Sequence, residues 1–229
     1  IWVPYTAITD YGRVCEYLAS EILDLGGEIR FQTAIRKIGQ SDVDVSLTSG
    51  SNEEFHTRKA AVCAGLWAGH LARASGLKIK HTIIPFKGNY YDLKRPESVS
   101  IGPLVYPVPN PAFPFLGVHW TRHLDGSISL GHNAVPSMRL SGMAELLKSG
   151  SPDHFAAEGS RFGWKVRACD LKKGKTGVRA LLVDHQGNLV DDFVVLQDGQ
   201  ITHVLNAPSP AATASLSIAR TLADSMQVH

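Results

Sequence analysis

The sequence has few cysteines, little net charge and no long hydrophobic stretch that lacks proline. Its 229 residues include only Cys15, Cys63 and Cys169, which are far apart and form no C-x-x-C pair. Such sparse cysteines favour a reducing compartment and give no sign of a zinc or dithiol pair. Lys and Arg total 23 against 21 Asp and Glu, a balance that does not support a nucleic-acid partner. The longest charge-free stretch, Ser98 to Thr121, contains five prolines, which exclude a membrane-spanning helix there.

Several catalytic and binding motifs are also missing. The sequence has neither a G-x-S-x-G nucleophile elbow nor a G-x-G-x-x-G dinucleotide turn. Gly174-Lys175-Thr176 is not a phosphate-binding loop, because Cys169 stands where that motif needs its first glycine. His119 and His123 are four residues apart but lack the glutamate of H-E-x-x-H, so we expect no metal site. The chain opens at Ile1 without a signal or transit peptide, and we interpret it as a fragment that lacks its natural N-terminus.

Hydrophobic periodicity and turn residues predict an α/β arrangement of helices and strands in the first third of the chain. Apolar residues at helical spacing follow a potential N-cap, and a glycine pair then ends the helix. A short apolar run, a glycine and a second helix follow, which is typical of an α/β domain. The predicted segments are a helix from Thr9 or Asp10 to Gly26-Gly27, strands at 28–35 and 43–47, and a strand at 60–64 with a helix to residue 74.

The rest of the chain reads mainly as strands. Leu124-Asp125-Gly126-Ser127 predicts a hairpin turn, because Asp-Gly adopts positive φ at low cost. Residues 137–176 show little periodicity. The predicted strands are 83–93, 115–121, 127–131, 178–184, 190–196 and 201–205, and a final helix covers 211–226.

An ordered set of segments carries a family resemblance. The main ones are 106–122, 125–135, 177–180, 189–193 and 203–213, and weaker ones are 10–11, 26–29, 63–66 and 85–91. Together they resemble the FAD-dependent L-2-hydroxyglutarate dehydrogenase/oxidase family of DAO-type flavin oxidoreductases. The chain departs from that family in three ways. It lacks the first strand, the G-x-G-x-x-G turn and the helix that follows. Residues 137–176 form a shorter segment than the helical stretch that the family has at this place. His132 stands where the family is expected to have proline.

The resemblance implies an α/β (α+β) fold with two domains. Residues 1–78 and 177–229 would form an FAD-binding Rossmann-like domain that is discontinuous and lacks its first βαβ unit. Residues 79–176 would form an antiparallel-sheet substrate-binding domain. The implied reaction is oxidation of L-2-hydroxyglutarate to 2-oxoglutarate by hydride transfer to FAD. The partners would be a small dicarboxylate 2-hydroxy acid and an electron acceptor, for which quinone, oxygen and a carrier protein all stay open.

Two alternatives stay open at this point. One is another DAO-type oxidoreductase that acts on an amino acid, sarcosine or glycerol phosphate. The other is a non-catalytic remnant that binds a small anion or a protein partner. The expected location is the cytoplasm or the periphery of the inner membrane in a bacterium, and the mitochondrion in a eukaryote.

Oxidation of a 2-hydroxy acid needs a cation for the carboxylate and a base for the hydroxyl proton. Arg179 is the candidate cation, because a guanidinium matches a carboxylate with two parallel hydrogen bonds. His119 is the candidate base, because histidine titrates near neutral pH. Lys87 and Tyr106 are candidates for the second carboxylate. His203 is expected to brace the loop before Asn206.

The flavin contacts are expected at two places. One is Ala64 and Gly65, at the end of a presumed parallel strand, where ligands of α/β sheets collect. The other is the start of the last helix, where backbone N–H groups at Ala211 and Ala212 would be free for a ligand. The resemblance implies that this loop runs beside the flavin ring. The predicted cofactor-binding residues are Ala64, Gly65, Asn206, Ser209, Pro210, Ala211, Ala212 and Thr213.

Overall fold

A computed structural model describes residues 3–5, 7–102, 104–108, 117–133, 135–136 and 150–226. The chain divides into two compact units, one of residues 1–29 and 86–179 and the other of residues 30–85 and 180–229. Parts of the segments that carry the family resemblance, residues 109–116 and Ala134, lie outside the described residues. The same holds for residues 137–149 of the poorly periodic region.

The division differs from the predicted domains in two respects. Residues 1–29 group with residues 86–179 instead of with residues 30–78. Residues 79–85, predicted in the substrate-binding domain, belong to the other unit. The boundary predicted at residue 177 and the observed one after Arg179 both lie inside strand β10 (Leu171–Val183).

In the first unit, helix α1 (Tyr11–Asp24) begins and ends as predicted. The Asp10 carboxylate accepts hydrogen bonds from the backbone N–H groups of Gly12 and Arg13, which is the usual N-cap arrangement. At the other end Gly26 has a φ of +80°. The N–H groups of Gly26 and Gly27 donate to carbonyls of the last turn, so the helix closes with a Schellman motif.

The strand predicted at 28–35 is wrong in its position. The regular strand β1 starts only at Ile35, and residues 31–32 form a turn. Gln32 has a φ of +55°, a left-handed conformation that cannot continue a strand.

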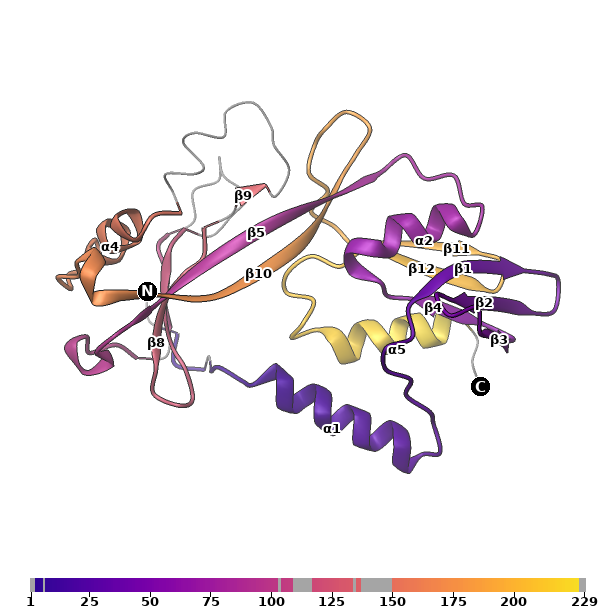
Figure 1. The fold of residues 1–229 in the computed structure, drawn as a ribbon, viewed down its shortest axis with the longest axis horizontal. Coiled ribbons are helices and arrows are strands. Elements are labelled where there is room, and N and C mark those ends of the chain that lie inside the picture. The colour runs from indigo at the N-terminus through magenta and orange to yellow at the C-terminus, as the bar shows by residue number, and fades with distance from the viewer. Residues whose placement is uncertain are drawn as a thin grey trace. The chain divides into compact units, whose positions relative to one another are not determined.

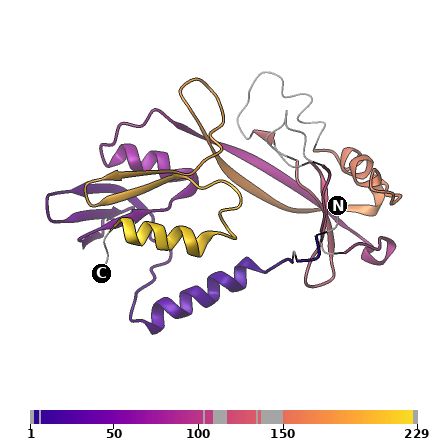
Figure 2. The ribbon, with the colours of Figure 1, turned by 180° about the vertical axis from the view of Figure 1, so that it is seen from behind.

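The first unit is built on an antiparallel sheet with the order β10-β5-β8-β7-β6, and β9 also pairs with β5. Figures 1 and 2 show β5 and β10 as the two longest strands, seen from opposite sides. The Asp125-Gly126 turn joins β7 to β8 as predicted: Gly126 has a φ of +83°, and the Asp125 carboxylate accepts from Ser127. The strands besides β10 are β5 (Thr82–Leu93), β6 (Leu104–Val105), β7 (His119–Arg122), β8 (Ile128–Gly131) and β9 (Val135–Pro136).

One face of this sheet carries the core of the first unit. Trp120 and Phe155 are its largest fully buried side chains, and the Trp120 indole N–H donates to the Gly159 carbonyl at 3.1 Å. Phe155 and Gly159 belong to helix α4 (Pro152–Ser160). Short 3-10 turns, η2 (Pro96–Ser98) and η3 (Ala168–Asp170), also belong to the described part of this unit.

The second unit contains two three-stranded sheets. The first has the order β1-β2-β3 and is antiparallel, and the second has the order β11-β12-β4, in which β12 and β4 run parallel. Ile38, Val45 and Ile201 belong to a buried core in this unit. The elements are β1 (Ile35–Gln40), β2 (Val45–Ser49), β3 (Glu54–Thr57), β4 (Ala60–Val62), η1 (Gly65–Trp67), α2 (Ala68–Ala74), β11 (Val194–Asp198), β12 (Ile201–Asn206) and α5 (Ser215–Ser225).

Two predicted boundaries in this unit shift. The strand predicted at 190–196 lies at 194–198, and the last helix starts at Ser215 instead of residue 211. The residues before that helix form turns, in which the Ala211 N–H donates to the Pro208 carbonyl and the Ala214 N–H to the Pro210 carbonyl. None of the helices in the described part of the chain has the length and apolar character that crossing a bilayer requires.

Candidate active site

Aromatic, imidazole and guanidinium groups from several strands of the first unit form one cluster, called here the His119 cluster. Tyr90 lies on β5, Tyr106 follows β6, His119 lies on β7, His132 follows β8, and Arg179 lies on β10. The Tyr106 ring stacks on His119 with centroids 4.5 Å apart. His132 meets His119 edge-to-face at 5.7 Å and Tyr90 at 5.8 Å. Electrostatic coupling links Arg179 to both histidines and to Tyr90.

The sheet register brings these rings together. Gly131 on β8 lies opposite both His119 and Tyr90. A methyl group at Gly131 would overlap the Tyr90 ring, and one at Gly88 would lie 3.2 Å from the His132 Cβ atom. Glycine at both positions therefore leaves the room that the Tyr90 and His132 side chains occupy.

His119 is held as a neutral base. Its side chain is 6% exposed, and its Nδ1–H donates to the Gly117 carbonyl at 3.1 Å. Burial lowers the pKa of His119, with a smaller contribution from Arg179, although the hydrogen bond to Gly117 opposes the change. Because Nδ1 carries the proton, the lone pair lies on Nε2. Nε2 is therefore the ring atom that can accept a proton.

His132 is a second neutral imidazole in the cluster. It is 4% exposed, and its Nδ1–H donates to the Asn133 carbonyl at 3.3 Å. Burial is the main reason that its pKa falls to about 4, and the charges of Arg179 and of protonated His119 lower it further. Neither His132 nor Tyr90 was among the predicted site residues. The one sequence signal at His132 was its departure from the expected proline.

Arg179 presents a positive charge that no acidic side chain neutralises within the described residues. Its side chain is exposed, and the ion pairs of the described part of the chain do not include it. Burial raises the pKa of both Tyr90 and Tyr106, so these phenols stay protonated and can donate hydrogen bonds. The cluster thus offers one cation and two phenol donors to an anionic group, and two imidazole nitrogens that can accept a hydrogen bond from a hydroxyl.

Lys87 is the one predicted substrate residue that the structure does not bring to the cluster. It lies on β5 three residues before Tyr90, so strand alternation places the two side chains on opposite faces. Lys87 shares its face with Tyr91, whose ring packs on Phe155 in the core at 4.8 Å. The Lys87 side chain itself is exposed.

The predicted cofactor residues lie in the second unit, near the ends of two paired strands. Ala64 and Gly65 follow β4, and Asn206 ends β12. Because β4 and β12 run parallel, their carboxyl ends share one edge of the sheet, where ligands of α/β sheets bind. Gly65 has a φ of +52°, and the space beside its Cα is open.

Asn206 has a structural task. Its amide Nδ2 donates to the carbonyls of Val190 and Asp192, both at 2.8 Å, and so fixes the segment before β11. His203 does not brace this loop, contrary to the prediction. Its Nε2–H donates to the Ser75 hydroxyl at 3.2 Å, and its buried Nδ1 has no hydrogen-bond partner among the described residues.

The segment 209–213 differs from the predicted helix start. The Ala211 N–H is engaged with Pro208 and is not free for a ligand as predicted, and the Thr213 hydroxyl donates to the Pro210 carbonyl. Of the two donors predicted there, the Ala212 N–H is not among the hydrogen-bonded backbone groups of the described residues. This N–H and the open glycine turn after β4 are the groups that would be available to FAD. Their position at the carboxyl edge of a parallel strand pair fits a dinucleotide.

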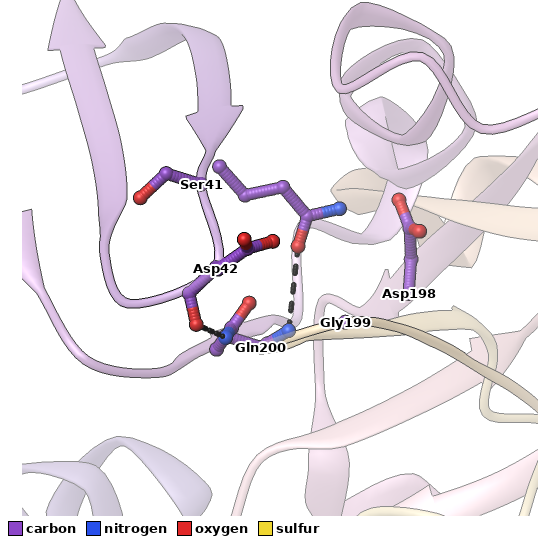
Figure 3. A pocket seen from close by; sticks show the side chains of 6 residues that line it. Ser41, Asp42, Asp198, Gly199 and Gln200 are labelled. Carbon is purple, nitrogen blue, oxygen red and sulfur yellow. Dashed lines mark hydrogen bonds between the residues drawn. The ribbon is translucent and has the colours of Figure 1, made fainter.

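A hollow of about 400 Å³ in the second unit contains none of these residues. It lies between the β1–β2 and β11–β12 turns, as Figure 3 shows. The Gln200 N–H donates to the Gln40 side-chain oxygen at 3.3 Å, and the Gln200 amide donates to the Asp42 carbonyl at 2.7 Å. These bonds tie two hairpins together, so we interpret the hollow as a structural junction.

Comparison with known proteins places the sequence among flavoenzymes. A family model described as FAD-dependent oxidoreductase (DAO) matches residues 1–225. The L-2-hydroxyglutarate dehydrogenase of Indibacter alkaliphilus is 35% identical over 98% of this chain and 64% of its own length. The mitochondrial L-2-hydroxyglutarate dehydrogenases of Caenorhabditis elegans and Homo sapiens are 34% and 31% identical over 96% and 98% of this chain. These matches cover 60% and 58% of those two relatives, so the chain spans about three fifths of their length.

Solved structures show the same fold at low identity. The FAD-bound L-α-glycerophosphate oxidase of Mycoplasma pneumoniae superposes with a TM-score of 0.72 at 17% identity, over 93% of this chain and 55% of that one. The L-proline dehydrogenase of P. horikoshii gives 0.67 at 12% identity, over 96% of this chain and 56% of that one. The predicted fold class, a mixed α/β fold with antiparallel sheets, is confirmed.

Proposed function

Since this chain belongs to the FAD-dependent oxidoreductase family, we propose that it acts in the oxidation of L-2-hydroxyglutarate to 2-oxoglutarate, with FAD as the hydride acceptor. The observation that carries the proposal is the His119 cluster. In it the buried, neutral His119 imidazole lies close enough to Arg179 for the guanidinium charge to lower its pKa. Arg179 itself has no acidic partner among the described residues. Several relatives that match nearly the whole chain bear the name L-2-hydroxyglutarate dehydrogenase.

In this proposal Arg179 binds the carboxylate next to the reacting carbon. Its planar fork donates two parallel hydrogen bonds, which orient the acid as well as hold it. The hydroxyl of the substrate then donates to Nε2 of His119, and this nitrogen takes the proton as the carbon–hydrogen bond breaks. Tyr106, which stacks on His119, keeps the imidazole plane in place, and its phenol can donate to a carboxylate.

When bound, FAD supplies the redox chemistry by accepting the hydride. The residues that would hold it are Ala64, Gly65, Asn206 and the turn of residues 209–213. Asn206 would act through the backbone it fixes, since its amide donors are already engaged. The small side chains of this turn let a flat ring approach its backbone closely.

The electron acceptor and the cellular location of the protein are also part of the proposal. The electrons would pass from the flavin to a quinone or to oxygen. The animal relatives are named as mitochondrial proteins, and we propose that location for this chain if its source is a eukaryote. In a bacterium we propose the cytoplasm or the inner-membrane periphery.

The test is an absorbance spectrum of the purified chain with FAD, followed by anaerobic addition of each acid. We expect a bound flavin spectrum that is bleached by L-2-hydroxyglutarate and not by the D acid. Lys172→Ala, an exposed change on the same strand as Arg179, is the matched control and should behave as the unchanged chain. Bleaching only by an amino acid, sarcosine or glycerol phosphate would contradict the hydroxy-acid proposal. Failure to bind FAD would contradict the cofactor role of this chain.

A further inference from the structure

A dicarboxylate substrate brings two negative charges, and the His119 cluster contains only one permanent cation. Arg179 is assigned to the carboxylate beside the reacting carbon. Lys87, the predicted second cation, lies on the opposite face of β5 from Tyr90. The proposed function therefore leaves the distal carboxylate without a charged partner in the cluster.

His132 has a ring nitrogen to which the proposed function gives no role. Its Nδ1–H is engaged with the Asn133 carbonyl, and its Nε2 forms no hydrogen bond with the residues that the structure describes. The position is built around this ring: Gly88 leaves room for it, and the Asn133 amide oxygen accepts from the Asn89 N–H at 3.0 Å, which ties the loop to β5. The residue as a whole is 4% exposed, but Nε2 is not among the buried unpartnered side-chain atoms of the described residues, so this nitrogen remains open to a ligand.

The groups that face His132 make its surroundings positive. Tyr90 on β5 is a neutral phenol, His119 on β7 is a neutral imidazole with a lowered pKa, and Arg179 on β10 is a full cation. Tyr106 lies against His119 and adds no charge. Among the described residues, the electrostatic causes acting on His132 include no carboxylate. An anion is therefore the ligand that this environment favours.

We propose that His132 recognises the second carboxylate of the dicarboxylate 2-hydroxy acid and takes up one proton as that acid binds. In the complex both ring nitrogens donate: Nδ1–H stays with the Asn133 carbonyl, and the new Nε2–H bonds the carboxylate. Arg179 and the His132 imidazolium then balance the two negative charges of the ligand. This inference rests on the proposed function and makes His132 the residue that selects dicarboxylates.

The direction of the pH effect follows from the ligand charges. In the free chain the pKa of His132 is about 4, with burial as the main cause and Arg179 next. The first carboxylate cancels the repulsion from Arg179, and the second adds attraction, so the pKa of His132 is higher in the complex. Affinity for a dicarboxylate then rises as pH falls, approaching about tenfold per pH unit between the bound and free pKa values. A monocarboxylate cancels only the first repulsion and gives a much weaker pH dependence.

The test is calorimetric binding of L-2-hydroxyglutarate to the chain between pH 5.5 and 7.5, where both carboxylates are ionised. Titrations in two buffers with different ionisation enthalpies give the number of protons taken up. L-2-hydroxyvalerate, which has a methyl group in place of the distal carboxylate, is the matched ligand and reports any proton uptake by His119. FAD is left out of these titrations, so the readout does not depend on turnover.

We expect uptake that approaches one proton per L-2-hydroxyglutarate at the acidic end and clearly less for L-2-hydroxyvalerate. The His132→Gln variant should lose this difference, while His185→Gln, an exposed change in the 184–188 turn, should keep it. Equal proton uptake on binding of the two acids would overturn the inference about His132 and leave the proposed function standing. The same holds if the difference in proton uptake between the two acids is unchanged in His132→Gln. Absence of binding by either acid would overturn the proposed function and, with it, the inference.

Discussion

Removing the Arg179 side chain should weaken acid binding and at the same time make the two cluster histidines easier to protonate. In Arg179→Ala the carboxylate loses a fork of two charge-assisted hydrogen bonds. A hydrogen bond to a charged group contributes about 1.5–3 kcal/mol, and solvent exposure of Arg179 argues for the lower end. A total loss of about 3 kcal/mol corresponds to binding of L-2-hydroxyglutarate that is ~10²-fold weaker.

The second effect has a definite sign. Arg179 lowers the pKa of His119 and of His132, although burial is the larger cause at both sites. Its removal should therefore raise both pKa values, with the larger rise at His132, where Arg179 is the second cause. Ring-nitrogen NMR shifts across a pH titration measure the two groups separately, and calorimetry measures the affinity.

Arg179→Lys separates charge from geometry. The lysine keeps the positive charge, so the histidine pKa values should stay close to those of the unchanged chain, but it lacks the planar fork and should bind the acid less tightly. Lys172→Ala serves again as the control on β10. If Arg179→Ala left both the affinity and the two histidine pKa values unchanged, the guanidinium would have no part in the site, and the reasoning from the cluster would be refuted.

Three further predictions test other links in the argument. His119→Asn should lower the rate of flavin reduction by about 10²–10⁴-fold while L-2-hydroxyglutarate still binds. Since burial lowers the pKa of His119, the rate of the unchanged chain should fall only at pH values below the usual range of histidine pKa values. A stopped-flow pH profile measures both effects. Gly159→Ala should destabilise the first unit by about 1–3 kcal/mol in denaturant unfolding, because the new methyl would lie 2.9 Å from Leu130 and 3.0 Å from Trp120; unchanged stability would contradict the tight packing of α4. Asp10→Ala should cost α1 about 1 kcal/mol, seen as faster amide exchange in its first turn, whereas Asp10→Ser should restore most of the protection.

Local chemistry made several elements predictable from the sequence. Asp10 and the Gly26-Gly27 pair mark the ends of α1, because a capping carboxylate and a positive-φ glycine act within a few residues. Asp125-Gly126 set the β7–β8 hairpin for the same reason. Predictions that depended on a run of apolar residues were less exact, as the late start of β1 shows.

The candidate site was predictable only in part. The family resemblance gave His119 and Arg179 roles that stay predictions, and the structure places both residues in one cluster with Tyr106. Lys87 was also chosen by resemblance, but the face on which it lies depends on the register of β5, which the motif does not encode. Tyr90 and His132 went unassigned because nothing in their local sequence shows what they face.

The sequence by itself determined the family, the strand and helix content and the chemical types available for catalysis, because these follow from local propensity and from motifs in a fixed order. Only the tertiary structure decided which of those groups meet and in which protonation state. Burial makes His119 and His132 neutral, and strand register brings Tyr90 to His132. Both depend on residues that are far apart along the chain, so the desolvation and charge that set the chemistry of the site arise only once the sheet has formed.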